Sequence, residues 1–507
     1  MAMMALQLKV SEISLGTLLH GYAAVSLREE RLISGVCMDS RIVRPGDLFL
    51  ACTGSRTTGV RYIDEALRRG AAAVAVEADS IGARIHGAVP LIPVADLAMQ
   101  AGVIVARFFG DPSSALNVIG ITGTNGKSSV AHYIAGSLHR LKAGSAGLIG
   151  TLGYGPFGQL APAVLTTPDP VTLQGEFARM RAAGVQTVVM EVSSHALQQG
   201  RIAGVAFRTA VFTNLSRDHL DFHGDMQGYG LAKRRLFEQP GLSQAVLNLD
   251  DDFGRELYRQ FADRLEIAGF RIATEPQEPV KAGRVVTAWI EHAALGSLRL
   301  RIQSPWGEGR LECALTGRFN ASNVLAAFAV LCMQGISFEK TVTVLQQAAP
   351  VAGRMECFTA PGRPTVVVDY AHTPDALTQS LQALRPHCRG SLICVFGCGG
   401  DRDRGKRAEM GAAAEANADQ VVITSDNPRS EPPLQIIGEI SAGMQRRAPV
   451  RIEPDRAAAI QSAISGAKPG DVVLVAGKGH EPYQEIGGRR IPYSDRLLVQ
   501  GLLREEA

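Results

Sequence analysis

The chain has 507 residues, of which 46% are hydrophobic and 20% are charged, and its formal net charge is +3. This ordinary globular composition excludes a disordered or fibrous chain, and the scattered cations give no reason to expect a nucleic-acid partner. At roughly 100–200 residues per domain, the length predicts about three domains.

Cysteine usage and hydropathy favour a cytoplasmic protein. The eight cysteines are scattered and none forms a C-x-x-C pair, so we expect a reducing compartment without a disulfide framework. Residues 1–10 lack the charged start and apolar run of a signal peptide. The longest apolar run, residues 324–333, is about half as long as a membrane span requires, so we expect no such span.

Lysine is scarce in this chain. Only 9 of the 52 cationic residues are lysines, and the other 43 are arginines. Because arginine serves wherever a plain surface cation is enough, each remaining lysine predicts a role that needs an amine. Lys127, Lys233, Lys406 and Lys478 fall in or beside polar loops, and the sequence gives no role for the last two.

The first block, residues 1–100, predicts a small α/β domain. Apolar runs at residues 47–51 and 72–76 predict strands, and residues 64–69 between them have a helical pattern. The second block, residues 101–350, opens on a further apolar run and ends on a segment whose proline and glycine resemble a hinge.

The third block, residues 351–507, alternates strand and helix patterns, which predicts a parallel sheet with helices on both faces. Polar, glycine-bearing segments follow directly after the predicted strands of the second and third blocks. Ligands bind beyond the carboxyl ends of parallel strands, so these loops predict two sheets that face one another across a cleft. The segments are residues 122–129, 191–195, 214–221, 369–375, 397–404, 425–429 and 477–481.

The strongest motif is Gly-Ile-Thr-Gly-Thr-Asn-Gly-Lys-Ser-Ser at residues 120–129, between a predicted strand and a predicted helix. Its glycines let backbone N–H groups surround phosphate oxygens, while Lys127 neutralises phosphate charge and Ser128 offers a hydroxyl to Mg²⁺. Ile121 occupies the position of the first glycine in the usual phosphate-loop pattern. The segment nevertheless predicts nucleotide binding.

The form T-G-T-N-G-K-[ST] resembles the phosphate loop of the Mur ligase family, and the resemblance extends from about residue 35 to residue 495. It implies three α/β domains: a UDP-sugar-binding domain over residues 1–100, an ATP-binding domain with a P-loop ATPase-like parallel sheet over 101–350, and a Rossmann-like amino-acid-binding domain over 351–507. Further matching segments are residues 166–168, 191–195, 214–221, 317–323, 353–354, 369–372 and 426–429.

The resemblance also implies an activity: an ATP-dependent, ADP-forming ligase that adds meso-2,6-diaminopimelate to UDP-N-acetylmuramoyl-L-alanyl-D-glutamate in peptidoglycan synthesis. ATP would phosphorylate the D-glutamate γ-carboxylate, and the amine would attack the acyl phosphate. We expect a cytoplasmic monomer that uses Mg²⁺ and serves cell wall biogenesis, cell shape, cell division and the cell cycle.

The resemblance assigns catalysis to Lys127, Glu191, His219 and Lys233, and the metal to Ser128, Glu191 and Lys233. Lys233 matches a lysine that CO₂ carbamylates, giving N6-carboxylysine. This reaction needs a neutral amine, so arginine cannot replace it. Taken from the residues alone, a solvated glutamate, a structural histidine and a solvated lysine remain open alternatives.

ATP contacts are assigned to the phosphate loop and to three later residues, with Asn320 at the adenine, Arg354 at the phosphates and Asp369 at the ribose. From the residues alone, Asn320 could also cap a helix and Arg354 could form an interdomain salt bridge. The full set is Gly123, Thr124, Asn125, Gly126, Lys127, Ser128, Ser129, Asn320, Arg354 and Asp369.

Specificity for diaminopimelate rests on residues 426–429. The planar guanidinium of Arg429 can hold a carboxylate through two hydrogen bonds, and lysine as a substrate has no second carboxylate to offer. Without the resemblance, Asp-Asn-Pro would be taken as a turn. The predicted contacts are Arg402, Asp426, Asn427, Pro428, Arg429, Gly477 and Glu481.

The nucleotide-sugar substrate is assigned two groups of residues. Met38, Ser40, Ser55, Arg56 and Thr57 match the uridine end, and Thr166, Thr167, Ser193, Gln199 and Arg201 match the dipeptide and diphosphate end. Three other functions stay open: an L-lysine-adding ligase, a regulatory P-loop ATPase, and a folylpolyglutamate synthase, which would have no use for a uridine-binding first block.

Overall fold

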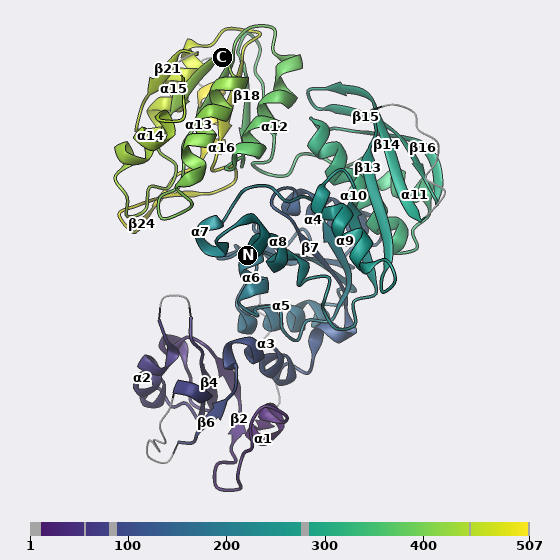
Figure 1. The fold of residues 1–507 in the computed structure, drawn as a ribbon. Coiled ribbons are helices and arrows are strands. Elements are labelled where there is room, and N and C mark those ends of the chain that lie inside the picture. Colours follow the sequence, from purple (N-terminus) through teal and green to yellow (C-terminus); the bar gives the residue numbers. More distant parts are fainter. Residues whose placement is uncertain (1–11, 55–56, 81–88, 275–282, 446–447, 505–507) are drawn as a thin grey trace. The chain divides into compact units, whose positions relative to one another are not determined.

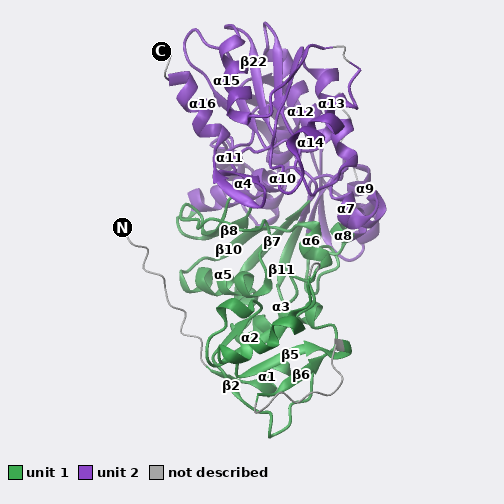
Figure 2. Cartoon of the chain, turned by 90° about the vertical axis from the view of Figure 1, so that its left-hand side faces the viewer, with its two compact units in different colours: residues 1–122, 142–210, 232–244 green, residues 123–141, 211–231, 245–507 purple. Residues whose placement is uncertain are grey.

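The structure is a computed structural model that describes residues 12–54, 57–80, 89–274, 283–445 and 448–504 (Figure 1). The described residues form two compact units (Figure 2). Unit 1 comprises residues 1–122, 142–210 and 232–244, and unit 2 comprises residues 123–141, 211–231 and 245–507. Among these residues, no helix is both long and apolar enough to cross a bilayer.

Unit 1 begins with a parallel four-stranded sheet in the order β3-β4-β5-β6. Successive side chains of β4 point to opposite faces, so Leu48 and Leu50 join one core and Phe49 joins another. Helix α3 covers the first face and α2 the second. The bounds are β3 Gly35–Cys37, β4 Asp47–Ala51, α2 Ile63–Arg68, β5 Ala73–Glu77, β6 Leu91–Val94 and α3 Leu97–Phe108.

The rest of unit 1 contains three parallel strands, β7, β10 and β8, with β9 antiparallel to β8. Their interiors are almost wholly buried, as expected for strands covered on both faces. The bounds are β7 Asn117–Thr122, β8 Ala146–Gly150, β9 Gly153–Pro156, α5 Pro170–Ala182, β10 Thr187–Glu191 and α6 Ser194–Gln198. Before β3, the chain forms a short antiparallel pair of strands, β1 Ile13–Ser14 and β2 Leu32–Ile33, with α1 Leu15–Leu19 between them in sequence.

In unit 2, helix α4 (Lys127–Leu141) packs against α10 (Arg318–Met333) and α11 (Phe338–Leu345). Strands β13 to β16 are consecutive neighbours: β13 and β14 are parallel, whereas β15 is antiparallel to both β14 and β16. The bounds are α9 Asp252–Phe261, β13 Glu266–Ile272, β14 Arg284–Ala294, β15 Ser297–Ser304 and β16 Gly307–Cys313. Helix α7 Leu220–His223 also belongs to unit 2, whereas β11 Phe207–Phe212, α8 Met226–Arg234 and β12 Gln244–Asn248 each have residues in both units.

Unit 2 ends in a six-stranded sheet in the order β17-β18-β22-β19-β20-β21, parallel except for β17. Helices α12 to α14 bury one face, and α15 and α16 bury the other. The strands are β17 Glu356–Phe358, β18 Thr365–Asp369, β19 Leu392–Phe396, β20 Gln420–Ile423, β21 Val450–Ile452 and β22 Val472–Ala476. The helices are α12 Pro374–Leu384, α13 Gly405–Asn417, α14 Pro433–Ser441, α15 Arg456–Gly466 and α16 Asp495–Arg504, and a hairpin of β23 Tyr483–Ile486 and β24 Arg489–Pro492 lies between β22 and α16.

These sheets confirm the predicted α/β class and the alternation of strands and helices in the third block. The domain boundaries at residues 100 and 350, and the cleft between two sheets, stay predictions.

Candidate active site

The phosphate loop runs from Gly123 to Gly126, directly before α4. The Lys127 ammonium donates hydrogen bonds to the carbonyls of Gly123 and Thr124, both at 2.8 Å. Gly126 has a φ of +86°, and a Cβ there would collide with the side chain of Asn323. The backbone therefore takes a left-handed conformation that favours glycine, in the place where a phosphate would approach the loop.

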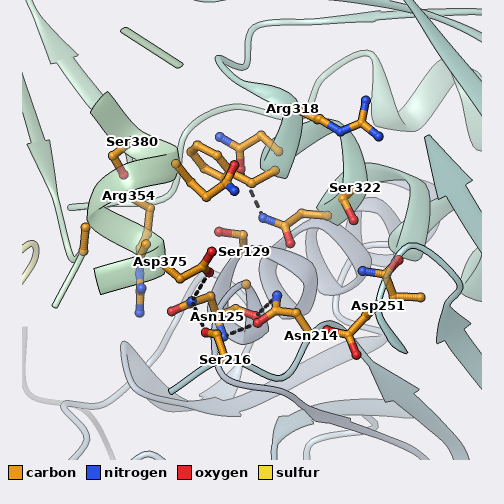
Figure 3. Close-up of a pocket in the computed structure, with 18 of the residues that line it drawn as sticks. Asn125, Ser129, Asn214, Ser216, Asp251, Arg318, Ser322, Arg354, Asp375 and Ser380 are labelled. Carbon is orange, nitrogen blue, oxygen red and sulfur yellow. Dashed lines mark hydrogen bonds between the residues drawn. The ribbon is translucent and has the colours of Figure 1, made fainter. Parts of the chain in front are cut away.

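A pocket of about 370 Å³ opens beside this loop (Figure 3). Its volume falls within the usual range of small-molecule sites. The structure brings six of the residues predicted to contact ATP to its wall, from the phosphate loop, from α10 and from the start of the C-terminal sheet. They are Asn125, Gly126, Ser129, Asn320, Arg354 and Asp369.

Arg354 reaches the first turn of α4, directly after the phosphate loop. Its guanidinium donates a hydrogen bond to the Ser128 hydroxyl at 3.1 Å and lies over the Tyr370 ring, 4.2 Å from the centroid. Asn125 donates from its side chain to Asp375 at 3.4 Å, as Figure 3 shows. The Arg354 guanidinium therefore lies beside the loop whose glycines could surround a phosphate.

Asn320 and Asp369 are both buried and hydrogen bonded. The Asn320 amide donates to the carbonyl of Thr316 at 2.9 Å. The Asp369 carboxylate accepts from the Met355 N–H at 2.9 Å and from the Ser380 hydroxyl at 2.7 Å. These bonds fix the orientation of both side chains at the pocket wall.

Sequence reasoning did not single out several residues that line this pocket. Asn214, Ser216, Tyr370 and Asp375 lie in polar loops that the sequence did mark, but with no individual signal. Arg318, at the start of α10, has no signal beyond its place in a matching segment. The set is Asn214, Ser216, Asp250, Arg318, Tyr370, Asp375 and Gln379.

Asp218 contacts both its neighbour His219 and two residues of the C-terminal sheet region, all within unit 2. Its buried carboxylate lies 3.0 Å from the Lys406 ammonium, 3.2 Å from His219 Nε2 and 3.5 Å from His372 Nε2. Burial alone would raise the pKa of Asp218, but Lys406 and the two histidines hold it well below its usual range. Lys406 thus neutralises a buried carboxylate next to a predicted catalytic histidine.

Unit 1 holds a second network. The Glu191 carboxylate, 1% exposed, accepts from the Thr151 N–H at 2.9 Å, and Thr151 also contacts Thr166 through its hydroxyl at 3.1 Å. The Thr167 hydroxyl donates to the Glu191 carbonyl at 2.8 Å and contacts the Ser193 hydroxyl at 3.3 Å. Glu191 thus lies among residues predicted for the dipeptide end.

Arg201 completes that network. It donates to the Thr167 carbonyl at 3.0 Å and to the Gln199 side chain. Burial lowers the pKa of Arg201, and within the described residues no carboxylate forms an ion pair with it. A half-buried guanidinium of this kind favours an anionic ligand.

The residues predicted for the uridine end are not joined to that network by any hydrogen bond or ion pair in the described part of the chain. The Ser40 hydroxyl donates to Glu65 at 2.7 Å, Met38 packs on the α3 side of the first sheet, and Thr57 contacts Tyr62. Ser55 and Arg56 lie outside the described residues.

Lys233 lies near the end of α8 and is 1% exposed. A lysine on a helix is ordinarily solvated, so this burial is unusual for the residue type.

All seven residues predicted for diaminopimelate follow β19, β20 or β22, which are neighbours in the order β22-β19-β20. Gly477 has a φ of +113° and lies against the Asp426 carboxylate, while Asn427 donates to Glu481 at 2.8 Å. Three loops separated by up to 79 positions in the chain therefore meet at one edge of the sheet.

Arg402 and Arg429 approach one another beside Gly399. A Cβ on Gly399 would contact both side chains. Burial and the Arg429 charge lower the pKa of Arg402. Arg429 donates to the Gly400 carbonyl at 2.7 Å and lies 3.4 Å from Glu485. Nearby carboxylates, Glu485 among them, offset part of this charge, and each planar guanidinium can hold a further carboxylate through two hydrogen bonds.

Comparison with known proteins places this fold and these loops in a family. Three family descriptions match: "Mur ligase family, catalytic domain" over residues 32–109, "Mur ligase middle domain" over 121–331, and "Mur ligase, glutamate ligase domain" over 353–479. The chain belongs to the Mur ligase family. This Mur ligase is 48% identical over 470 residues, 93% of its length and 95% of its relative's, to UDP-N-acetylmuramoyl-L-alanyl-D-glutamate–2,6-diaminopimelate ligase of Coxiella burnetii.

The enzyme of the same name from Alkalilimnicola ehrlichii is 49% identical over 503 residues, 97% of this Mur ligase and 99% of the relative. A solved structure titled UDP-N-acetylmuramoyl-L-alanyl-D-glutamate–2,6-diaminopimelate ligase superposes with a TM-score of 0.68 and is 32% identical, over 98% of this chain and 99% of that one. The predicted family is confirmed, and with it the prediction of a ligase.

Proposed function

We infer that this Mur ligase joins meso-2,6-diaminopimelate to UDP-N-acetylmuramoyl-L-alanyl-D-glutamate with hydrolysis of ATP to ADP and phosphate, as a step of peptidoglycan synthesis. The observation that carries this inference is the sequence identity with ligases of that name, 48% over 93% of the chain in one case and 49% over 97% in the other. The paired guanidiniums of Arg402 and Arg429 support the amine, because diaminopimelate carries a second carboxylate that lysine lacks.

ATP is proposed to occupy the pocket beside the phosphate loop. The loop N–H groups and Lys127 would hold the β- and γ-phosphates, Arg354 would offset charge that develops during phosphoryl transfer, and Asn320 would face the base. The hydrogen bond from Arg354 to Ser128 supports this arrangement, since it brings the guanidinium to the loop.

Mg²⁺ is the proposed metal, because Ser128, Glu191 and a carbamate on Lys233 would each offer it an oxygen atom, the ligand type that this ion prefers. Among the described residues no group of three or more His, Cys, Asp or Glu side chains could hold a metal. Mg²⁺ needs no such group, because it keeps several waters and binds through one or two carboxylates together with substrate phosphates. When bound, it neutralises phosphate charge during transfer.

The chain's own residues would then position and protect the reacting groups. Thr167, Ser193 and Arg201 are proposed to hold the anionic dipeptide so that the γ-carboxylate of its D-glutamate can react with ATP. Glu481 would bind an ammonium of diaminopimelate, and Arg402 and Arg429 its distal carboxylate, leaving the other amine to attack the acyl phosphate. In this arrangement the binding energy of the substrates orients the reacting groups, and no protein nucleophile takes part.

The function is tested by measuring phosphate release with UDP-N-acetylmuramoyl-L-alanyl-D-glutamate and either meso-diaminopimelate, L-lysine or no amine. We expect release only when both substrates are present, with L-lysine poorer than diaminopimelate by about 10⁴, because its use leaves charged groups of the site unpaired. Equal rates with lysine would refute the proposed specificity. Release that depends on neither substrate would instead indicate a regulatory ATPase.

The carbamate is tested separately by Lys233→Ala. We expect this variant to lose activity and to recover part of it when a short-chain carboxylate such as acetate is added, because the added anion can replace the carbamate. Lys340→Ala, which removes a lysine that lies far along the chain in α11, serves as the control. Near-normal activity of Lys233→Ala without acetate would refute the carbamate.

A further inference from the structure

Lys478 is a wholly buried cation that the proposed mechanism does not use. It lies in the loop after β22, with 0% of its surface exposed. Its ammonium donates to Glu481 Oε2 at 2.8 Å and to Asn427 Oδ1 at 2.9 Å, and lies 3.8 Å from Asp426 Oδ1. Three residues proposed to bind diaminopimelate therefore share one lysine.

The contact fixes which way Asn427 faces. An ammonium can only donate hydrogen bonds, so the amide atom that meets Lys478 must be the oxygen. The same oxygen accepts from the Glu485 N–H at 2.9 Å, and the amide nitrogen consequently donates to Glu481 Oε2 at 2.8 Å. Lys478 thus sets the orientation of an amide whose two ends would otherwise be interchangeable.

Glu481 is held by one oxygen only. Both Lys478 and Asn427 donate to Oε2, and within the described residues Oε1 accepts no hydrogen bond. A carboxylate fixed in this way keeps one oxygen for an incoming ammonium. Without the lysine, the carboxylates of Glu481 and Asp426 would face one another in a buried site with no cation between them, which disfavours ionisation of both.

We propose that Lys478 is a positioning residue of the amine-substrate site, which holds Glu481 and Asn427 in the orientation that receives an ammonium group of the amino-acid substrate. The inference rests on the proposed function, because it takes Glu481 as the contact to diaminopimelate. Arginine is a poor replacement, since its larger planar fork must fit where a compact point charge is completely enclosed.

The test compares Lys478→Met with Lys468→Met, which removes an exposed lysine from the same region of the chain. We expect Lys478→Met to raise KM for meso-diaminopimelate at least tenfold while KM for ATP and for the nucleotide substrate stays within twofold of wild type. Lys468→Met should leave all three values unchanged. A purely structural lysine would instead move the three values together, and that result, or an unchanged KM for diaminopimelate, would overturn the inference.

A double-mutant cycle with Glu481→Gln keeps the inference testable where Lys478→Met alone folds poorly, because the double variant leaves no unpaired charge between these two positions. If Lys478 acts through Glu481, adding Lys478→Met to Glu481→Gln should raise KM for diaminopimelate less than twofold further. A further tenfold rise would overturn the inference. Turnover of diaminopimelate by the wild type is measured first, and its absence would refute the proposed function instead.

Discussion

Buried charges of unit 2 are each held by partners on other segments of the chain. The Arg407 guanidinium, which is wholly buried, donates to Glu431 at 2.8 Å and to Glu439 at 2.7 Å. Lys406, its neighbour in sequence, meets Asp218 instead. Two adjacent cations on α13 thus serve different tasks: one fixes the packing of its own sheet region, and the other faces a loop with a predicted catalytic histidine.

His480 is a partly buried group with a lowered pKa. Burial, together with the charges of Arg354 and Arg496, lowers the pKa of His480 to about 3. The unfolded chain binds a proton at this residue below a pKa of about 6.5, so its contribution to stability is complete above that pH and is lost as the pH falls toward 3. We expect the free energy of unfolding of the wild type to fall by up to about 1.4 kcal/mol per pH unit more steeply than that of His480→Gln.

Denaturant unfolding at pH 7.5, 6.5 and 5.5 measures the free energy of unfolding of both proteins. The slopes of this free energy with pH should nearly coincide at pH 7.5 and differ most at pH 5.5. His20→Gln, at an exposed position, is the control and should follow the wild type. Parallel curves for His480→Gln and wild type at all three pH values would show that the histidine is protonated in the folded protein.

Residue types and spacing were enough to predict the phosphate loop, because it is a short contiguous pattern. The loop at residues 426–429 was predicted as a binding site only through the family resemblance. The partner of Lys406 could not be predicted in the same way. Asp218 lies 188 positions earlier in the chain, and its contact depends on how two segments pack. Lysine scarcity indicated that Lys406 and Lys478 have roles, but the roles themselves required the positions of Asp218, Asn427 and Glu481.

At the scale of elements, the phosphate loop depends on the helix beside it. Asn323 on α10 packs against Gly126, and α10 packs against α4, which the loop precedes. Any side chain at position 126 must therefore strain the loop and also displace a residue of a buried helix. The loop conformation is consequently maintained by tertiary packing as well as by its glycines.

Gly126→Ala should weaken ATP binding at least tenfold, because the φ of +86° disfavours alanine and its methyl group would collide with Asn323. The strain itself should cost about 1–2 kcal/mol of stability. Titration calorimetry with ATP and thermal unfolding measure the two effects. Gly335→Ala has a similar φ of +83° but open space around its Cβ, so it should lose stability without losing ATP affinity. Equal ATP affinity in the two variants would contradict the proposed role of the loop.

In the third block, β-rich runs at residues 365–369, 391–396, 420–424 and 471–475 predict four strands, and β18, β19, β20 and β22 begin and end within one residue of these runs. The short strands β17 and β21 of the same sheet were not predicted. The order β22-β19-β20 was not predicted, because hydropathy gives the position of a strand but not its neighbour. That order is what gathers Arg402, Arg429 and Glu481 at one edge. The site was therefore predictable as a set of residues, largely through family resemblance, and not as a geometry.

A buried ion pair joins the last two helices of the chain, α15 and α16. Arg456 and Asp495 are both wholly buried, and their side chains meet at 2.8 Å. Arg456 also donates to the carbonyls of Ser425 and Ala476. Ser425 lies just after β20 and Ala476 is the last residue of β22, and the loops that follow hold residues proposed for the amine site. This pair therefore connects the stability of the sheet with the position of its loops.

Arg456→Met should destabilise the protein by about 3–5 kcal/mol, because it leaves the Asp495 carboxylate buried without its cation. Thermal or denaturant unfolding measures the loss. Arg385→Met, which removes an exposed pair with Asp419 at 2.6 Å, should cost less than about 1 kcal/mol. If the two variants were equally stable, the buried pair would be contributing no more than a surface one.

The residues proposed for the amine site lie in loops at the ends of β19, β20 and β22, while the side chains that hold these strands together lie on the two faces of the sheet. Substitutions that alter the choice of amine are thus largely separate from those that alter folding. A lineage could exchange one amino-acid substrate for another through a few loop changes and keep the same core. Laboratory evolution toward a new amine would accordingly find its productive variants in three short windows of the gene.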